Sequence, residues 1–484
     1  MSSKPKPISR REFISRGSQA AAGIVAGSVL VSSTFAAPVV SNRVIGANDR
    51  LLVAHIGIRS QGRSLMRGFA GIANVEVKTL CDVDLNLIPE RAAEAAEIQG
   101  TTPGAEQDMR RVFEDKDITA VVIATPNHWH ALATIWACQA GKHVFVEKPI
   151  SHNIWEGRKM VEAARRYDRI VQSGFMNRSR AAVRQAIQFL HDGRLGDIYM
   201  ARGLCFKPRN SLESYPDGPL APGEEFSFTA GSDRKEPPYT PSYLAKVDYD
   251  LWLGPAPKRP FNRNRFHYNW HWHWDYGNGD TGNQGPHQFD IARWGLNKHD
   301  HPVKIRSFGG YFAFDSSQET PNTQTSIFEY ADGTILEFGT RGLYTNAEEQ
   351  VRIGNLFYGT EGWMSIDGNG QEWQTYFGRK NEPGPGSAAQ PDAEGGDPLV
   401  LTSIAGGHYQ NFIDAIRSGR REDLTCEIEE GHRSTVLPHL GNISYLLGRD
   451  LIFDGKKEKF VGDREADKLL SRKYRRPYVV PKTV

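Results

Sequence analysis

Two ionisable side chains stand where this sequence predicts a reacting centre. Lys148 ends an apolar run and precedes Pro149, and ligands of open α/β sheets bind at such strand ends. His287 follows Pro286, which suits the first turn of a helix. Because imidazole titrates near neutral pH, His287 is the natural acid or base for moving a proton. The plainer interpretations are a solvated lysine and a core histidine.

A glycine-rich frame lies upstream of both residues. Residues 57–62 read Gly-Ile-Arg-Ser-Gln-Gly, a G-x-G-x-x-G pattern with Arg59 at the second glycine. Asp82 follows Gly62 by 20 positions, about where a carboxylate meets the ribose of a bound dinucleotide. The guanidinium of Arg59 crowds the usual backbone approach but can pair with phosphate oxygens. The cofactor candidates here are Gly57, Arg59, Ser60, Gln61, Gly62 and Asp82, with an ordinary glycine turn as the alternative. Asp82 would repel a 2′-phosphate, which favours NAD over NADP.

The elements that position these residues alternate along the chain. Over residues 50–174, apolar runs alternate with amphipathic segments, a pattern that predicts a doubly wound parallel sheet. The predicted strands cover 51–56, 75–80, 120–125 and 143–146. Helical periodicity runs from Trp129 to Ala140, and Asn153 with Glu156 forms a capping-box-like start for another helix.

After Gly174 the pattern of predicted helices and strands changes. A helix is expected over 181–191, strands over 198–206 and within 302–377, a surface loop over 381–398, and helices over 407–418 and 430–447. Asp332-Gly333 is a hairpin signal between two strand-like runs. Residues 207–280 show little periodicity. The fold class is therefore α/β, with a mainly antiparallel sheet in the second part.

Four short motifs resemble those of the Gfo/Idh/MocA oxidoreductase family, which includes glucose-fructose oxidoreductase and inositol dehydrogenase. They are Cys-Asp-Val-Asp at 81–84, Thr-Pro-Asn-His-Trp-His at 125–130, Val-Glu-Lys-Pro at 146–149 and Gln-Ser-Gly-Phe-Met-Asn at 172–177. The resemblance implies an NAD(P)-binding Rossmann domain over 48–177 and a C-terminal substrate-binding and oligomerisation domain with a large open sheet over 178–484. It also implies that Thr125, Asn127, His130, Glu147 and Asn177 lie against the cofactor, and that the protein forms a homo-oligomer through this sheet.

The family pattern also bears on the reacting centre. It places the lysine that matches Lys148 beside the nicotinamide and the substrate hydroxyl. It has an Asp four residues before the His and a second Asp three after; here these positions hold Asn283 and Asp290. In a helix, Asn283, His287 and Asp290 would share one face. Without the first Asp the imidazolium loses stabilisation, although Asp280 lies nearby in sequence. We expect His287 to act as base while Lys148 lowers the alcohol pKa.

An aromatic segment supplies a substrate clue. Residues 266–276 read Phe-His-Tyr-Asn-Trp-His-Trp-His-Trp-Asp-Tyr, a density that suits stacking on sugar rings. The substrate candidates are Trp252, Tyr268, Trp270, Trp274 and Asp290, with aromatic packing or an oligomer contact as the alternative. The three histidines of this segment lack completing carboxylate or cysteine ligands, so no metal site is expected.

The first 36 residues form a separate region. Five basic residues and Glu12 precede an uncharged apolar stretch that is shorter than the ~18 residues that suggest a membrane span. Residues 9–14, Ser-Arg-Arg-Glu-Phe-Ile, resemble a twin-arginine export signal. We expect export to the periplasm; the alternative is an uncleaved basic tail. The whole chain has a net charge of +2 and this leader alone has +4, so the remaining residues have a net charge of −2. That charge gives no reason to expect a nucleic-acid partner. No later segment suggests a membrane span.

Several functions remain open at this point. The favoured one is NAD-dependent oxidation of a sugar, polyol or glycoside hydroxyl with a tightly bound cofactor, because an exported enzyme is not expected to meet a free NAD pool. Its turnover can end in oxidation by passing electrons to an unknown acceptor, or in a redox-neutral exchange between two sugars. The alternatives are net glycoside hydrolysis by oxidation, elimination and reduction, and a Rossmann protein that binds sugar without turnover.

Overall fold

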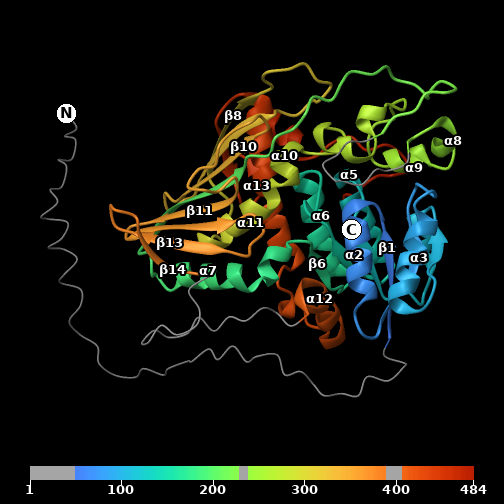
Figure 1. The fold of residues 1–484 in the computed structure, drawn as a ribbon, viewed down its shortest axis with the longest axis horizontal. Helices are drawn as coiled ribbons and strands as arrows, with labels where there is room; N and C mark the ends of the chain where they lie inside the picture. The colour runs from blue at the N-terminus through green and yellow to red at the C-terminus, as the bar shows by residue number, and fades with distance from the viewer. Residues whose placement is uncertain (1–49, 228–237, 388–405) are drawn as a thin grey trace, which may run out of the picture. The chain divides into compact units, whose positions relative to one another are not determined.

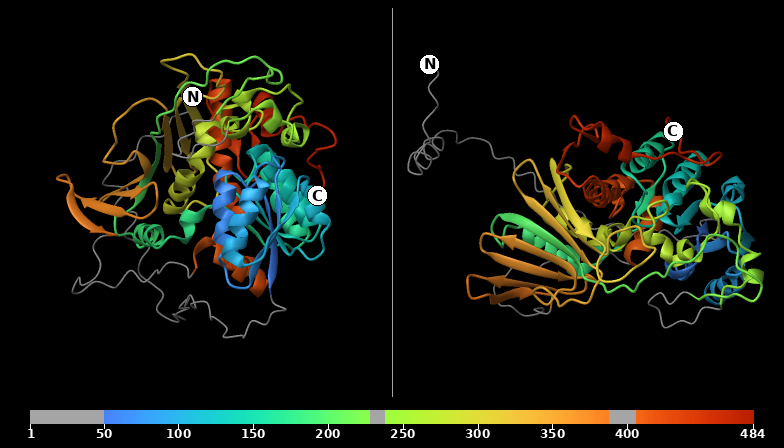
Figure 2. Two further views of the ribbon diagram at one scale, coloured as in Figure 1. Left: turned by 45° about the vertical axis from the view of Figure 1, so that its right-hand side comes forward. Right: turned by 90° about the horizontal axis from the view of Figure 1, so that it is seen from above.

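A computed structural model describes residues 50–227, 238–387 and 406–484 of the chain. Two sheets with their packed helices organise these residues (Figure 1, Figure 2). Among the helices of these ranges, none is long and apolar enough to span a bilayer. The export signal expected over 1–36 lies outside the described residues.

The first sheet is parallel and follows the order β3-β2-β1-β4-β5-β6. Its strands are β1 (Leu51–Ile56), β2 (Val75–Cys81), β3 (Gly104–Glu106), β4 (Ala120–Ile123), β5 (His143–Val146) and β6 (Val171–Ser173). Its helices are α2 (Ser60–Ala70), α3 (Ile88–Gln99), α4 (Met109–Glu114), α5 (Asn127–Gln139) and α6 (Ile154–Arg166). The strand order reverses between β1 and β4, where open sheets bind ligands. The predicted doubly wound sheet is confirmed.

The second sheet follows the order β14-β13-β12-β11-β7-β10-β9-β8-β15-β16. Its strands are β7 (Ile198–Cys205), β8 (Lys304–Gly310), β9 (Thr323–Glu329), β10 (Ile335–Arg341), β11 (Ile353–Gly359), β12 (Gly362–Asp367), β13 (Trp373–Phe377), β14 (Glu382–Gly386), β15 (Leu451–Asp454) and β16 (Lys459–Phe460). Within the described chain, β7 and β10 pair in parallel and the other pairs are antiparallel. The mainly antiparallel second sheet is therefore confirmed.

Helices cover one face of this second sheet. They are α7 (Ala181–His191), α11 (Gly285–Gly295) and α13 (Ile428–Leu447) (Figure 2). Their buried apolar side chains form one core cluster with those of the sheet. The remaining described α-helices are α8 (Pro241–Leu244), α9 (Tyr249–Leu253), α10 (Gly279–Asn283), α12 (Gly407–Ser418) and α14 (Arg464–Asp467).

Local sequence signals explain some of the element boundaries. The Asn153 side chain accepts a hydrogen bond from the Glu156 amide at 3.0 Å and caps α6. Gly333 takes φ +83° in the turn that joins β9 to β10. The loop expected over 381–398 is wrong in part, because β14 lies within it; its residues 388–405 lie outside the described residues. β14 is an edge strand, the position in a sheet where prolines are tolerated.

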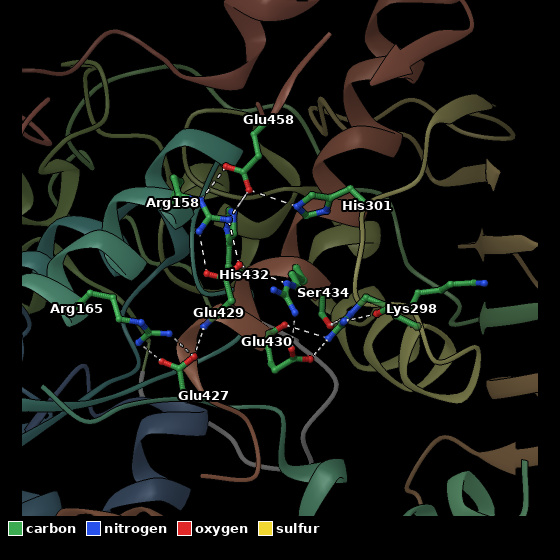
Figure 3. Close-up of polar contacts among 12 residues, drawn as sticks. Arg158, Arg165, Lys298, His301, Glu427, Glu429, Glu430, His432, Ser434 and Glu458 are labelled. Carbon is green, nitrogen blue, oxygen red and sulfur yellow. Dashed lines mark hydrogen bonds and ion pairs between the residues drawn. The ribbon is translucent and has the colours of Figure 1, made fainter. Parts of the chain in front are cut away.

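Segments from the C-terminal part of the chain complete the hydrophobic core of the parallel sheet. Phe412 of α12 packs edge-on against Phe69 and Phe145, with ring centroids about 6 Å apart. An ionic network joins α6 to α13 and to the β15–β16 turn (Figure 3): Arg158 donates to Glu429 and Glu458, at 2.8 and 2.7 Å. The division expected at 177/178 stays a prediction, and the packing shows that side chains from beyond it stabilise the Rossmann sheet.

Candidate active site

A cavity of about 300 Å³ lies at the carboxyl ends of the parallel strands. It brings together most of the residues singled out from sequence. Those that line it are Gly57, Arg59, Ser60, Gln61, Asp82, Thr125, Asn127, His130, Glu147, Lys148, Trp252, Tyr268, Trp270, Asn283 and His287. Gly62, Asn177, Trp274 and Asp290 lie outside this lining. One cavity thus joins the glycine frame to the expected reacting centre.

The turn between β1 and α2 depends on two glycines. Gly57 takes φ +82°, and a Cβ there would lie 2.7 Å from the Ala124 carbonyl oxygen. A Cβ on Gly62 would lie 1.9 Å from the Gly57 carbonyl oxygen, so Gly62 shapes the turn from behind the cavity. The first turn of α2 starts at Ser60 and presents its N-terminus there. Such a helix start favours a phosphate group, so the turn fits a dinucleotide.

Asp82 stands at the end of β2, beside this turn. Its Oδ2 accepts a hydrogen bond from the Ile58 amide at 2.9 Å, and its Oδ1 accepts one from the Asp84 amide at 3.0 Å. Burial raises the pKa of Asp82 to about 6, although these amides and the charge of Arg59 act in the opposite direction. The carboxylate keeps lone pairs for the hydroxyls of a ribose.

Groups at the ends of β4 and β5 form the middle of the cavity. His130 places its ring nitrogens 2.7 Å from the carbonyl oxygens of Thr125 and Pro149, and burial lowers the pKa of His130 to about 4. Glu147 accepts a hydrogen bond from Gln61 at 3.1 Å, and burial raises the pKa of its carboxyl. The hydrogen bond between Gln61 and Glu147 thereby joins α2 to the end of β5.

Asn127 and Asn177, both inferred from the motifs, take different positions. Asn127 opens α5 and donates to Asn278 Oδ1 at 3.1 Å. Asn177 is buried in the short helix η2 (Met176–Ser179), next to the cavity wall formed by Met176. Asn127 therefore lines the cavity directly, and Asn177 lies behind the wall.

Lys148 and His287 meet at the far end of the cavity. The Lys148 ammonium donates to the Asn283 carbonyl oxygen at 2.9 Å, and the Lys148–Pro149 peptide is cis. Burial lowers the pKa of Lys148, while Glu147 acts to raise it. Burial, together with the charges of Lys148 and Arg180, holds the pKa of His287 well below its usual range. At neutral pH the imidazole is therefore neutral and able to accept a proton.

The expected acid partners of His287 are engaged elsewhere. Among the described residues, Nδ1 of His287 is buried and has no hydrogen-bond partner. Asp280 accepts two hydrogen bonds from Arg209, at 3.0 and 2.6 Å. The expectation that Asp290 reaches the substrate is not supported by its position, because it is 1% exposed and forms a multiple hydrogen bond with Arg178.

Aromatic side chains form a wall opposite the nucleotide turn. Trp252 lies in a buried aromatic cluster and stacks on Tyr249, with ring centroids 5.6 Å apart. Trp270 stacks on His271 with ring centroids 3.6 Å apart, and the ring centroids of Tyr268 and His271 are 4.8 Å apart. Trp274 instead donates from its indole nitrogen to the Glu319 carbonyl oxygen at 3.1 Å, outside the lining.

Several lining residues were not identified from sequence. Val83, Gln107 and Met109 follow the ends of β2 and β3, and His267 and His271 belong to the aromatic segment. Their position after parallel strands was the available signal for the first three. The two histidines were weighed only as metal ligands. In the structure burial lowers the pKa of His271 to about 3, and its Nδ1 lies 2.6 Å from the Tyr268 carbonyl oxygen.

One group outside the cavity has metal-ligand chemistry. His301, His432 and Glu458 hold their ligand atoms within 4.8 Å of one another (Figure 3). Arg158, however, donates to both oxygens of Glu458, at 3.1 and 2.7 Å. A guanidinium in this position repels a cation and already neutralises the carboxylate. The group is best described as part of the ionic network.

Comparison with known proteins covers both parts of the chain. Residues 55–175 match the family described as "Oxidoreductase family, NAD-binding Rossmann fold". Residues 225–342 and 405–480 match "Oxidoreductase family, C-terminal alpha/beta domain". Both descriptions belong to the Gfo/Idh/MocA group.

Individual relatives match over shorter stretches. A glycosyl hydrolase family 109 protein from Shewanella pealeana is 30% identical over 171 residues, which are 33% of this chain and 37% of the relative. A levoglucosan dehydrogenase from Pseudarthrobacter phenanthrenivorans is 38% identical over 133 residues, 28% of this chain and 33% of the relative. The chain therefore matches only about a third of the length of these relatives.

The solved structure of the aldose-aldose oxidoreductase from Caulobacter crescentus, complexed with glycerol, extends the likeness. It covers 84% of this chain and 100% of its own, with a TM-score of 0.58 at 17% identity, and so shows a shared fold. Both family descriptions are matched, and the glycine turn and Asp82 lie at the switch point of the sheet. This chain belongs to the Gfo/Idh/MocA family of oxidoreductases, whose N-terminal Rossmann fold binds NAD.

Proposed function

We propose that this protein is an NAD-dependent oxidoreductase that oxidises a hydroxyl group of a sugar, polyol or glycoside. The observation that carries the proposal is the single cavity, which is lined by the glycine turn and Asp82 at one end and by Lys148, His287 and aromatic side chains at the other. Hydride transfer needs a cofactor, a proton acceptor and an oriented alcohol within one such space.

The residues of the far end would share the proton chemistry. Bound nicotinamide would supply the hydride acceptor. Neutral His287 takes the hydroxyl proton, which its lowered pKa allows at neutral pH. The Lys148 ammonium, held by the Asn283 carbonyl, donates to the same oxygen and stabilises the charge that develops there. Asn283 carries no charge to stabilise the imidazolium that results.

The aromatic wall supports a carbohydrate as substrate. Tyr268, Trp270 and Trp252 line the same cavity as Lys148 and His287. Ring faces of this kind stack on the C–H face of a sugar, while the polar tips bond to its hydroxyls. The matched levoglucosan dehydrogenase and aldose-aldose oxidoreductase act on sugars by name, in agreement with this assignment.

A spectrum of the purified protein tests the proposal. Acid denaturation should release NAD if the cofactor stays bound through purification, and externally added NAD serves if it does not. Addition of a sugar that the enzyme oxidises should then produce absorbance near 340 nm. If no nucleotide binds, or no member of a broad panel of sugars, polyols and glycosides changes the spectrum, the proposal is wrong.

Net glycoside hydrolysis is a second candidate, favoured by the glycosyl hydrolase family 109 match. The same groups would serve it, because transient oxidation of the sugar acidifies a neighbouring C–H and permits elimination of the aglycone before reduction. Release of free aglycone without net NADH from a chromogenic glycoside would support this route. Accumulation of a keto-sugar with stoichiometric NADH would support net oxidation.

We also propose that residues 1–36 direct export by the twin-arginine route to the periplasm. The support is the Ser-Arg-Arg-Glu-Phe-Ile motif ahead of an apolar stretch. Replacement of Arg10 and Arg11 by lysine should leave the full-length protein in the cytoplasmic fraction. Unchanged periplasmic recovery of this double variant would contradict the assignment.

A second copy of the chain is the proposed partner of the open sheet face. Phe308, Ile327 and Ile452 lie on this face in adjacent strands and are 52%, 37% and 48% exposed. An apolar strip of this kind on a sheet favours an interface. Phe308→Glu should reduce the molar mass measured by light scattering, and an unchanged mass would argue against this face.

A further inference from the structure

One segment outside the Rossmann sheet forms part of the wall of this cavity. Residues 241–272, called here the roof, include α8 and α9 and end in the aromatic segment (Figure 1). Trp252, His267, Tyr268, Trp270 and His271 of the roof line the cavity. The roof touches the Rossmann part at two places on either side of this lining.

The first attachment joins the roof to the loop after β2, residues 82–86. The Leu85 amide donates to the Lys246 carbonyl at 3.2 Å, and the Asp248 amide donates to the Val83 carbonyl at 2.9 Å. Asp84 and Val247 thereby form an antiparallel bridge. Since Asp82 and Val83 line the cavity, the bridge lies beside its ribose end.

The side chain of Asp84 reinforces this bridge. It is 0% exposed, its Oδ2 accepts a hydrogen bond from the Tyr243 hydroxyl at 2.9 Å, and the His267 ring lies 3.3 Å from the same oxygen. Its Oδ1 accepts from Asn86, whose side-chain amide also donates to the Tyr243 carbonyl at 3.0 Å. Although burial acts to raise it, these bonds hold the pKa of Asp84 below its ordinary value.

The second attachment is to α5. The indole nitrogen of Trp129 donates to the Leu251 carbonyl at 3.0 Å, and His128 Nε2 lies 2.9 Å from the Trp252 carbonyl oxygen. A Cβ on Gly254 would lie 2.2 Å from the Trp129 indole, so the two segments are in tight contact. The roof is thus fastened to both sides of the crevice that the strand ends create.

We propose that Asp84, Asn86 and Tyr243 form a latch that retains the dinucleotide, an inference that rests on the proposed NAD-dependent function. A dinucleotide seated on the glycine turn would face the roof residues that line the same cavity, and the roof meets residues 82–86 beside Asp82, the carboxylate expected at the ribose. The Asp84 amide also donates to Asp82 Oδ1. This hydrogen bond joins the latch directly to Asp82, the carboxylate expected to bind the ribose. Opening of the latch therefore limits the rate of cofactor dissociation.

Tyr243→Phe tests the latch, because it removes the hydroxyl donor and leaves the cavity lining intact. NADH is loaded onto the full-length protein, and its dissociation is followed by fluorescence during a chase with excess NAD. The dissociation rate constant should rise about tenfold, the change expected when one hydrogen bond to a charged acceptor is lost. Tyr249→Phe is the matched control, because its hydroxyl bonds within the roof, to the Pro260 carbonyl.

Asn86→Ala probes the same latch from the Rossmann side. It should accelerate NADH release as Tyr243→Phe does, while the melting temperature of nucleotide-free Tyr243→Phe stays within a few degrees of the wild type. Release at the wild-type rate in both variants would overturn the latch and leave the proposed function intact. A wild-type protein that binds no NADH would instead overturn the proposed function, and the latch with it.

Discussion

The two ends of the cavity are built in different ways. The nucleotide end consists largely of backbone: the turn at 57–62, the start of α2 and the amides that hold Asp82. The reacting end consists of side chains from separate segments, with Lys148 after β5 and His287 on α11. The first end follows from consecutive residues, whereas the second exists only after two sheets have packed together.

The electrostatics of the two ends differ as well. At the nucleotide end both carboxylate oxygens of Asp82 already accept backbone hydrogen bonds. At the reacting end the described residues offer no partner to His287 Nδ1, and Lys148 is held through one backbone carbonyl. The Lys148 ammonium keeps donors for a substrate oxygen and His287 lines the same cavity, so proton chemistry is assigned to the second end and nucleotide recognition to the first.

The largest expected effect is a loss of turnover in variants of the reacting end alone. His287→Ala and Lys148→Ala should each lower kcat by about 100-fold or more, because each removes a group that exchanges or stabilises a proton in the transition state. Steady-state kinetics on an oxidised sugar measures the loss. The amount of NAD bound should stay close to that of the wild type in both variants, because the two ends act independently.

The comparison fails if these variants lose nucleotide instead. A parallel loss of bound NAD and of kcat would mean that the reacting end also holds the cofactor. Tyr344→Ala offers a control for generic damage, because Tyr344 is 92% exposed and does not line the cavity.

The next effect breaks the nucleotide end. Gly62→Ala places a methyl group against the Gly57 carbonyl oxygen, where the ideal Cβ lies at 1.9 Å. Overpacking of a fixed backbone costs about 1–3 kcal/mol, which should appear as a lower melting temperature and weaker NAD binding. Gly100→Ala is a useful contrast, since its Cβ would meet nothing within 4 Å, although φ +81° strains it. Equal NAD affinity in the Gly62 variant and the wild type would show that the turn tolerates expansion.

This division explains what could be predicted from sequence. The turn, Asp82 and the strands around them were predictable, because periodicity and glycine spacing are local. Lys148 and His287 were predicted with help from motifs. The ion pair of Asp290 with Arg178 joins residues 112 positions apart, so no local pattern indicates it, and the role expected for Asp290 at the substrate stays a prediction. The roof latch was not foreseen, because nothing local to Asp84 indicates that it will pair with Tyr243.

A smaller effect sharpens the nucleotide end through pH. Burial raises the pKa of Asp82 to about 6, so the side chain is a carboxylate above pH 6 and increasingly protonated below it. The ratio of NAD to NADP affinity should therefore be largest above pH 7 and fall several-fold by pH 5, as repulsion of the 2′-phosphate disappears. Titration of both nucleotides by fluorescence between pH 5 and 8 measures this ratio.

Asp82→Asn separates the protein's contribution from that of the ligand. The 2′-phosphate itself titrates near pH 6, so part of the pH dependence belongs to NADP. The variant should show a lower ratio of NAD to NADP affinity at pH 7.5 and a flatter profile than the wild type. Identical profiles for the two proteins would assign the whole dependence to the ligand.

The smallest effect sharpens the reacting end. Asn283→Asp adds a negative charge one helical turn before His287 and leaves intact the backbone carbonyl that holds Lys148. A nearby carboxylate raises the pKa of an imidazole, so the acid limb of the profile of kcat/KM against pH should move to higher pH. Stabilisation of the imidazolium should also raise kcat a few-fold near pH 8, where His287 still starts neutral. Asn369→Asp, on an exposed loop, is the matched control for added charge. A lower kcat with no shift of the acid limb would mean that His287 is not the base, and that Lys148 alone handles the hydroxyl proton.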